Sequence, residues 1–301
     1  MIHKRKNMTP FNDSIQLMHN EFPKEFHEVA ELPGEYEKDA NRDVIQDGNI
    51  VGEMDISSII NEEDNGISTK MAFNGEHQST PVDEPKLRQM GNYEIQQIHD
   101  HNIPHISAVL TNIPEEKHLH EFAITRTMII RPQYIVYDEK NIEKRLNRAK
   151  EIINNNEHLS NVDALNLGMI AVFAPRDKAL EITEEVIKLY ARVSEQLSKL
   201  MELTLYSVFY QMIDAYSEKE EDYQRLIDVL DNNTEEETIE YSKTMRKLKK
   251  DLKTMSKFKE ENKTLKLKNM ALEAKYAAPI DIVTSIENEL NIRNHGSLNG
   301  K

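Results

Sequence analysis

Apolar residues follow two different patterns along the chain, and the pattern changes near residue 140. Upstream of that point they gather in short runs, at about 49–60, 67–78 and 105–113, with the length and composition of buried β-strands. The segment 61–66 separates the first two runs and ends in Asn-Gly, a pair that tolerates the positive φ angles of a hairpin turn. The pattern therefore predicts an antiparallel hairpin with its two strands side by side.

A helix and further strands are expected after this hairpin. Asp83 can cap a helix over about 84–100, because its side chain accepts hydrogen bonds from free N–H groups of the first turn. Two short β-like runs, 122–130 and 134–137, follow the 105–113 strand. The order hairpin, helix, strand, strand predicts an α/β or α+β core in which the helix crosses over the sheet.

Downstream of residue 140, apolar residues recur every three to four positions, as they do in amphipathic helices. This spacing predicts helices over 141–155 and 179–214. Residues 236–276 contain no glycine or proline, and their apolar positions predict roughly three heptads of coiled coil. The expected organisation is an N-terminal loop (1–24), an α/β domain (25–140), a helical domain (141–235), a basic helix or coiled coil (236–278) and a flexible tail (279–301).

Charge is distributed unevenly along the 301 residues, whose net charge is −15. Residues 1–140 hold 13 basic and 25 acidic residues, whereas 243–275 hold 12 basic and four acidic residues. The basic segment could bind nucleic-acid phosphates, but a solvated face of a coiled coil is the favoured interpretation. The chain has no cysteine, which excludes disulfides and Cys-based zinc sites, and no apolar run long enough for a transmembrane helix. A cytoplasmic location without a membrane partner is expected.

Two acidic residues stand on the predicted hairpin strands, where carboxylates are depleted. Asp55 belongs to the first strand and Glu76 to the second, together with Gln78, whose side chain leaves the same face. A converging Asp and Glu can hold a divalent cation through hard oxygen ligands. Such a cation would activate water and neutralise charge on a scissile phosphate, with Gln78 orienting that water. The alternative is that both acids are solvated surface residues.

The order of these residues resembles the PD-(D/E)XK nuclease superfamily, in which an acid on one strand precedes Glu-x-Lys or Glu-x-Gln on the next. Asp55 and the tripeptide Glu76-His77-Gln78 match that pattern. The longer string 76–81, Glu-His-Gln-Ser-Thr-Pro, resembles the recombination-promoting nuclease and transposase-associated branch. That branch also has a long helical segment after its nuclease core, as this chain is expected to have.

Further residues extend the resemblance beyond the acid pair. Gln89 and Tyr93, four positions apart on one face of the predicted helix, resemble the Gln-x-x-x-Tyr motif of RecB-like members. In the family these residues lie near the metal and the nucleic acid. Members often carry another acid upstream of the first strand, and Glu35 is the best match for it here.

The resemblance implies a restriction-endonuclease-like core over about residues 25–140, followed by an all-α, partly coiled-coil region. It implies that Asp55 and Glu76 bind Mg²⁺, or Mn²⁺ or Ca²⁺, that Gln78 completes the catalytic set, and that the reaction is phosphodiester hydrolysis in DNA. It also implies a setting in recombination or mobile DNA. The C-terminal helices would set partner choice or assemble a homo-oligomer.

Three departures favour a different class of function, a catalytically inactive nuclease fold that serves as an oligomeric interaction module. Gln78 lacks the positive charge of the usual lysine. Gly75 weakens the strand just before Glu76. The acidic domain offers no surface that would track DNA. A coiled-coil structural protein is a third interpretation, and the β-rich first half of the chain speaks against it.

Five histidines invite a separate metal-site interpretation. They are expected in helix-end and loop segments, and no acid or cysteine stands at a convincing ligand spacing, so the favoured interpretation is solvated loop positions: His99, His101, His105, His118 and His120.

Overall fold

The computed structural model describes residues 10–46 and 49–244 and the single positions 247, 248, 254 and 268. Met1–Ser242 form one compact unit and Lys243–Lys301 a second. The division expected between residues 140 and 141 lies inside the first unit. Most of the predicted coiled coil and all of the predicted tail lie outside the described residues.

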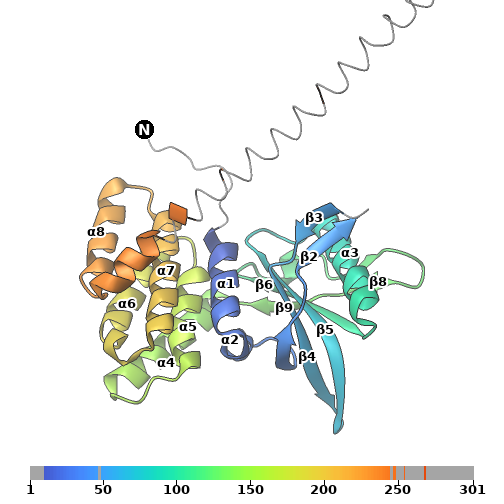
Figure 1. Ribbon diagram of the computed structural model, residues 1–301, viewed down its shortest axis with the longest axis horizontal. Helices are drawn as coiled ribbons and strands as arrows, with labels where there is room; N and C mark the ends of the chain where they lie inside the picture. Colours follow the sequence, from blue (N-terminus) through green and yellow to red (C-terminus); the bar gives the residue numbers. More distant parts are fainter. Residues whose placement is uncertain (1–9, 47–48, 245–246, 249–253, 255–267, 269–301) are drawn as a thin grey trace, which may run out of the picture. The chain divides into compact units, whose positions relative to one another are not determined.

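A mixed five-stranded sheet forms the centre of the first unit, with strand order β1-β4-β5-β6-β9 (Figure 1). β1 and β5 run antiparallel to β4, while β5, β6 and β9 run parallel. The α+β class expected from the sequence is therefore confirmed, whereas the restriction-endonuclease-like topology stays a prediction. The strands are Glu35–Asp39 (β1), Ile56–Asp64 (β4), Ile67–Gln78 (β5), His105–Thr111 (β6) and Gln133–Val136 (β9).

The predicted hairpin forms, with a tighter turn than expected. β4 and β5 pair as far as Asp64 and Ile67, so only Asn65 and Gly66 remain as the turn. Both have positive φ angles, 52° and 78°, which is the geometry that two-residue hairpin turns require. The expected loop over 61–66 is thus reduced to its last two residues.

Two small antiparallel hairpins correct other strand predictions: β2 (Asp43–Gln46) with β3 (Asn49–Glu53), and β7 (Phe122–Ala123) with β8 (Ile129–Ile130). The run 49–60 is not one strand, because the chain bends at Met54 and Asp55 and passes from β3 into β4. The run 122–130 turns back on itself, because Thr125 Oγ1 accepts hydrogen bonds from the backbone of Thr127 and Met128.

One helix covers one face of the sheet and connects two parallel strands, as predicted. α3 (Glu84–His101) runs between β5 and β6, and Asp83 caps it by accepting a 3.1 Å hydrogen bond from Lys86 N. Leu87 and Met90 of α3 pack in one apolar cluster with Val109 of β6. The helix is therefore fixed at both its first turn and its apolar face.

The other helices lie on the opposite side of the sheet, where the first two helices of the chain contact its strands and the rest pack on one another (Figure 1). The largest apolar cluster joins Ile56, Phe73 and Leu110 of the sheet to residues of these helices, so both belong to one core. The helices are α1 (Pro10–Glu21), α2 (Pro23–Val29), α4 (Glu139–Asn154), α5 (Asn161–Val172), α6 (Ala179–Ala191), α7 (Lys199–Tyr216) and α8 (Glu220–Asp231), with 3-10 turns at Glu115–Lys117 and Ser194–Gln196.

Three helix predictions need correction. The expected N-terminal loop (1–24) contains α1. The expected helix over 179–214 is two helices, because a new one starts where Ser198 Oγ accepts a hydrogen bond from Met201 N. α5 was not predicted, because its residues from Ala164 to Val172 are all buried and show no polar face. Among the described residues, no helix has the length and apolarity needed to cross a bilayer.

Two buried histidines fasten α1 and α2 to the sheet. His19 Nε2 and His27 Nε2 lie 3.2 and 3.1 Å from Ser58 Oγ on β4. Burial lowers the pKa of His19 to about 4 and that of His27 to about 3. Asp39 opposes the shift in the His19 pKa and Arg42 adds to it. Both rings are therefore neutral in the folded protein at neutral pH.

We expect these histidines to make folding acid-sensitive. In the unfolded chain a histidine takes up a proton near pH 6.5, whereas the folded protein does not until about pH 4 or below. Their contribution to stability is therefore present above pH 6.5 and is lost as the pH falls, at about 1.4 kcal/mol per pH unit for each ring. The free energy of unfolding, measured between pH 6.5 and 4, should fall less steeply in His27→Gln than in the exposed control His99→Gln. Equal slopes would contradict this prediction.

Candidate functional site

Asp55 and Glu76 meet where the chain enters the central sheet. Asp55 lies in the bend just before β4, not inside a strand as expected, and Glu76 lies near the end of β5. Because Ile56 pairs with Gly75, the two acids are the next residues along both strands. Asp55 N donates a 3.4 Å hydrogen bond to Glu76 Oε1. The residues are only 6% and 3% exposed, so both carboxylates are largely removed from water.

Gly75 allows the strands to pack closely beside the acid pair. A Cβ atom at this position would lie 3.1 Å from Ile56 Cδ1 and 3.1 Å from a ring atom of Phe73. The glycine that weakens the strand by propensity therefore makes room for an apolar side chain under the site.

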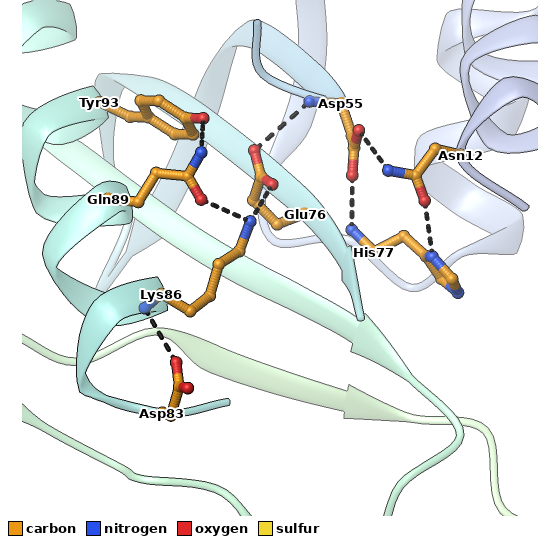
Figure 2. A network of polar contacts seen from close by, with 8 residues as sticks. All are labelled: Asn12, Asp55, Glu76, His77, Asp83, Lys86, Gln89 and Tyr93. Atoms are coloured by element: carbon orange, nitrogen blue, oxygen red, sulfur yellow. Dashed lines mark hydrogen bonds and ion pairs between the residues drawn. The ribbon is translucent and has the colours of Figure 1, made fainter. Parts of the chain in front are cut away.

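Lys86 of α3 contacts Glu76 directly (Figure 2). Its Nζ lies 2.7 Å from Glu76 Oε2 and 3.2 Å from Gln89 Oε1. The Gln89 amide in turn donates to the Tyr93 hydroxyl. Lys86, Gln89 and Tyr93 are three and four positions apart, so one face of α3 carries all three toward the acid pair.

Asn12 and His77 hold Asp55 from the other side (Figure 2). Asn12 Nδ2 donates to Asp55 Oδ1 at 2.9 Å, and His77 N donates to Asp55 Oδ2 at 3.0 Å. The Asn12 amide oxygen lies 2.8 Å from His77 Nδ1 and can only accept, so Nδ1 carries the proton. The His77 ring stacks on Phe11. α1 therefore helps to position Asp55, although its residues were expected to be a loop.

Burial controls the charge of the pair. Burial, and after it the neighbouring Asp55, raise the pKa of Glu76 to about 7, against the lowering effect of Lys86. Burial also raises the pKa of Asp55, against the lowering effect of the His77 N–H. Burial raises the pKa of Tyr93 as well, which keeps its hydroxyl protonated. Near neutral pH the two carboxyls therefore retain a proton for part of the time.

The remaining predicted site residues divide into near and distant ones. Gln78 is half-buried at the end of β5, two residues beyond Glu76 and in register with Thr111. Glu35 is exposed on β1 and pairs with Asn61 of β4. Asn61 lies six residues after Asp55 in the chain. Six residues of strand span about 20 Å, so the structure does not bring Glu35 to the acid pair.

The histidine segment is partly buried: His105 and His118 have buried side chains, whereas His99 and His120 are exposed. His118 is buried, with Nδ1 accepting from Val82 N at 2.9 Å and Nε2 lying 3.2 Å from Ile113 O. The His105 side chain is also buried, 3.7 Å from Glu94. The described part of the chain contains no group of three or more His, Cys, Asp or Glu side chains placed to hold a metal ion. The solvated-loop interpretation is therefore wrong for His105 and His118.

Two residues of the site were missed from the sequence. Lys86 stands one helical turn before Gln89, so its spacing could have placed it on the same face of the predicted helix. Asn12 gave no signal, because it lies 43 residues from Asp55 in a segment without a predicted element.

Asp55 and Glu76 suit Mg²⁺, which proteins commonly bind through one or two carboxylates, with water and phosphate oxygens as the other ligands. Lys86 would compete for Glu76 Oε2. Comparison with known proteins adds nothing to this geometry: no protein-family model, curated protein or solved structure matches the chain.

We expect Lys86→Gln to raise the pKa of Glu76, because the substitution removes the cation that stabilises its ionised form. The rise should be about one unit or more. Carbon-13 NMR titration of the glutamate carboxyl groups would measure it, with Lys70→Gln as the control because Lys70 forms an exposed ion pair with Glu37. An unchanged Glu76 pKa would show that the Lys86 contact has no electrostatic effect.

Proposed function

We propose that this chain is a metal-dependent nuclease that hydrolyses phosphodiester bonds in DNA. The observation that carries the proposal is the convergence of Asp55 and Glu76, both buried, with Lys86 Nζ 2.7 Å from Glu76 Oε2. Buried acids of this kind are costly, and such groups concentrate at functional sites. The resemblance to the PD-(D/E)XK superfamily supports the same reading of the two acids.

Each residue of the site has a role in this proposal. Asp55 and Glu76 would hold Mg²⁺, or Mn²⁺ or Ca²⁺, which supplies Lewis-acid activation of water and neutralises phosphate charge. Gln78 orients the attacking water. The Lys86 ammonium offers the positive charge that Gln78 lacks and so stabilises charge developing on the phosphate. Gln89 positions Lys86 through its amide oxygen.

A second candidate function has its own supporting observation. Glu76 already has a cation, Lys86, and Asp55 already has two hydrogen-bond donors, Asn12 and His77. Such an internally satisfied network also suits a catalytically inactive nuclease fold that acts as an oligomeric interaction module. Assembly through the C-terminal helices, a role in recombination or mobile DNA, and a cytoplasmic location belong to these proposals too.

We expect Mg²⁺- or Mn²⁺-dependent cleavage of plasmid or single-stranded DNA by the wild-type chain. Glu76→Gln should reduce the rate by roughly two or more orders of magnitude, because it removes a charged metal ligand worth several kcal/mol. Glu37→Gln, at an exposed glutamate, is the matched control and should cleave normally. No cleavage by any variant over a range of metals and substrates would favour the interaction module.

We also expect Mg²⁺ binding to release a proton below neutral pH. The pKa of Glu76 is raised to about 7 in the metal-free protein, so the carboxyl must lose a proton before it can act as an anionic ligand. Affinity should therefore rise with pH and level off above about pH 8. Titration calorimetry in buffers of different ionisation enthalpy would detect proton release near pH 6 and little near pH 8. A Mg²⁺ affinity that does not change with pH would exclude Glu76 as a titrating ligand.

A further inference from the structure

A row of buried polar side chains continues from the acid pair across the sheet. Ser57 pairs with Asn74, and Asn74 pairs with Ser107, so β4, β5 and β6 each contribute one residue to the row. Their exposed fractions are 1%, 0% and 5%. Asn74 precedes Glu76 by two residues, so both side chains leave the face of β5 that α3 covers.

Gln97 of α3 lies over this row of side chains, on the α3 side of the sheet. Its Nε2 and Ser57 Oγ both donate to one acceptor, the backbone oxygen of Asn41, at 2.8 and 3.1 Å. The shared acceptor places Gln97 next to Ser57, and Gln97 is fully buried. The four side chains therefore lie together between α3 and the sheet, and we call them the polar layer.

Four of the six side-chain nitrogen and oxygen atoms in the polar layer have no partner among the described residues. Within the described residues, both amide atoms of Asn74, the Oε1 atom of Gln97 and the hydroxyl of Ser107 are buried without a hydrogen bond. Isolated buried polar atoms are costly, and a group of them in one place indicates a ligand that pairs with them.

We propose that the polar layer is a binding site for ordered water. The unpaired set mixes groups that only donate, the Asn74 NH₂, with groups that only accept, Asn74 Oδ1 and Gln97 Oε1, and with a Ser107 hydroxyl that does both. A cation would meet the NH₂ group and an anion would meet two carbonyl oxygens, whereas water donates and accepts and commonly makes about three bonds in such sites.

This water would join α3 to the sheet directly beside the acid pair. α3 carries Lys86 and Gln89, and its C-terminal half would be held through water-mediated hydrogen bonds at Gln97. The inference is independent of nuclease activity, since it concerns residues that contact neither a metal nor a substrate in the proposed reaction.

The test compares Asn74→Leu with Thr183→Val in the full chain. Thr183 Oγ1 is also buried without a partner, but it stands alone on α6. If water pairs with the polar layer, Asn74→Leu removes part of its site and increases the unfolding equilibrium constant about tenfold or more, lowering the urea midpoint. Thr183→Val should leave the midpoint unchanged or raise it. A higher midpoint for Asn74→Leu would overturn the proposal, because it would show that the amide was truly unpaired.

A second measurement on the wild-type chain covers the case in which Asn74→Leu does not fold. Magnetisation transfer from long-lived water to the Asn74 side-chain NH₂, in protein labelled with nitrogen-15 asparagine, should be detected by NMR. The signal is identified by its loss in Asn74→Asp. An Asn74 NH₂ signal without a water contact would refute the bound water.

Discussion

The desolvation of two adjacent carboxyls is the constraint on which the rest of this site depends. Asp55 and Glu76 lose most of their contact with water and repel one another when both are ionised, which raises both pKa values. The fold compensates with donors from three directions: Lys86 from α3, the His77 backbone from β5 and Asn12 from α1. The two helices that carry Lys86 and Asn12 are themselves held by apolar packing.

This arrangement couples the two layers that enclose the sheet. α3 covers one face and supplies the cation, whereas α1 belongs to the helices on the opposite side and contacts Asp55 through Asn12. His77 shows the coupling within one residue, because its backbone donates to Asp55 while its ring packs against Phe11. A substitution in α1 that removes the Asn12 hydrogen bond should therefore affect Asp55, which Asn12 contacts directly.

The same contacts are compatible with both proposed functions, the metal-dependent nuclease and the inactive interaction module. Lys86 can stabilise charge on a phosphate only if it also tolerates a metal beside Glu76, and it can stabilise a metal-free fold with no further change. The two functions differ in whether a hard cation binds Glu76 more strongly than the Lys86 ammonium does. Protons and metal ions compete for the Glu76 carboxylate, so the pKa of Glu76 bears on both proposed functions.

The sequence by itself determined the elements whose signals are local. The Asn65-Gly66 turn, the Asp83 cap and the short apolar runs of the hairpin strands are local signals, and they place Asp55 beside Glu76. Lys86 could have been predicted from helix periodicity, because it lies one turn before Gln89 on the predicted helix. Tertiary structure alone decided the bend at Asp55 and the helix that carries Asn12. Those features depend on burial between segments far apart in the chain. α5 is a related case: it is buried on every side, so its sequence lacks the alternation of apolar and polar residues from which an amphipathic helix is predicted.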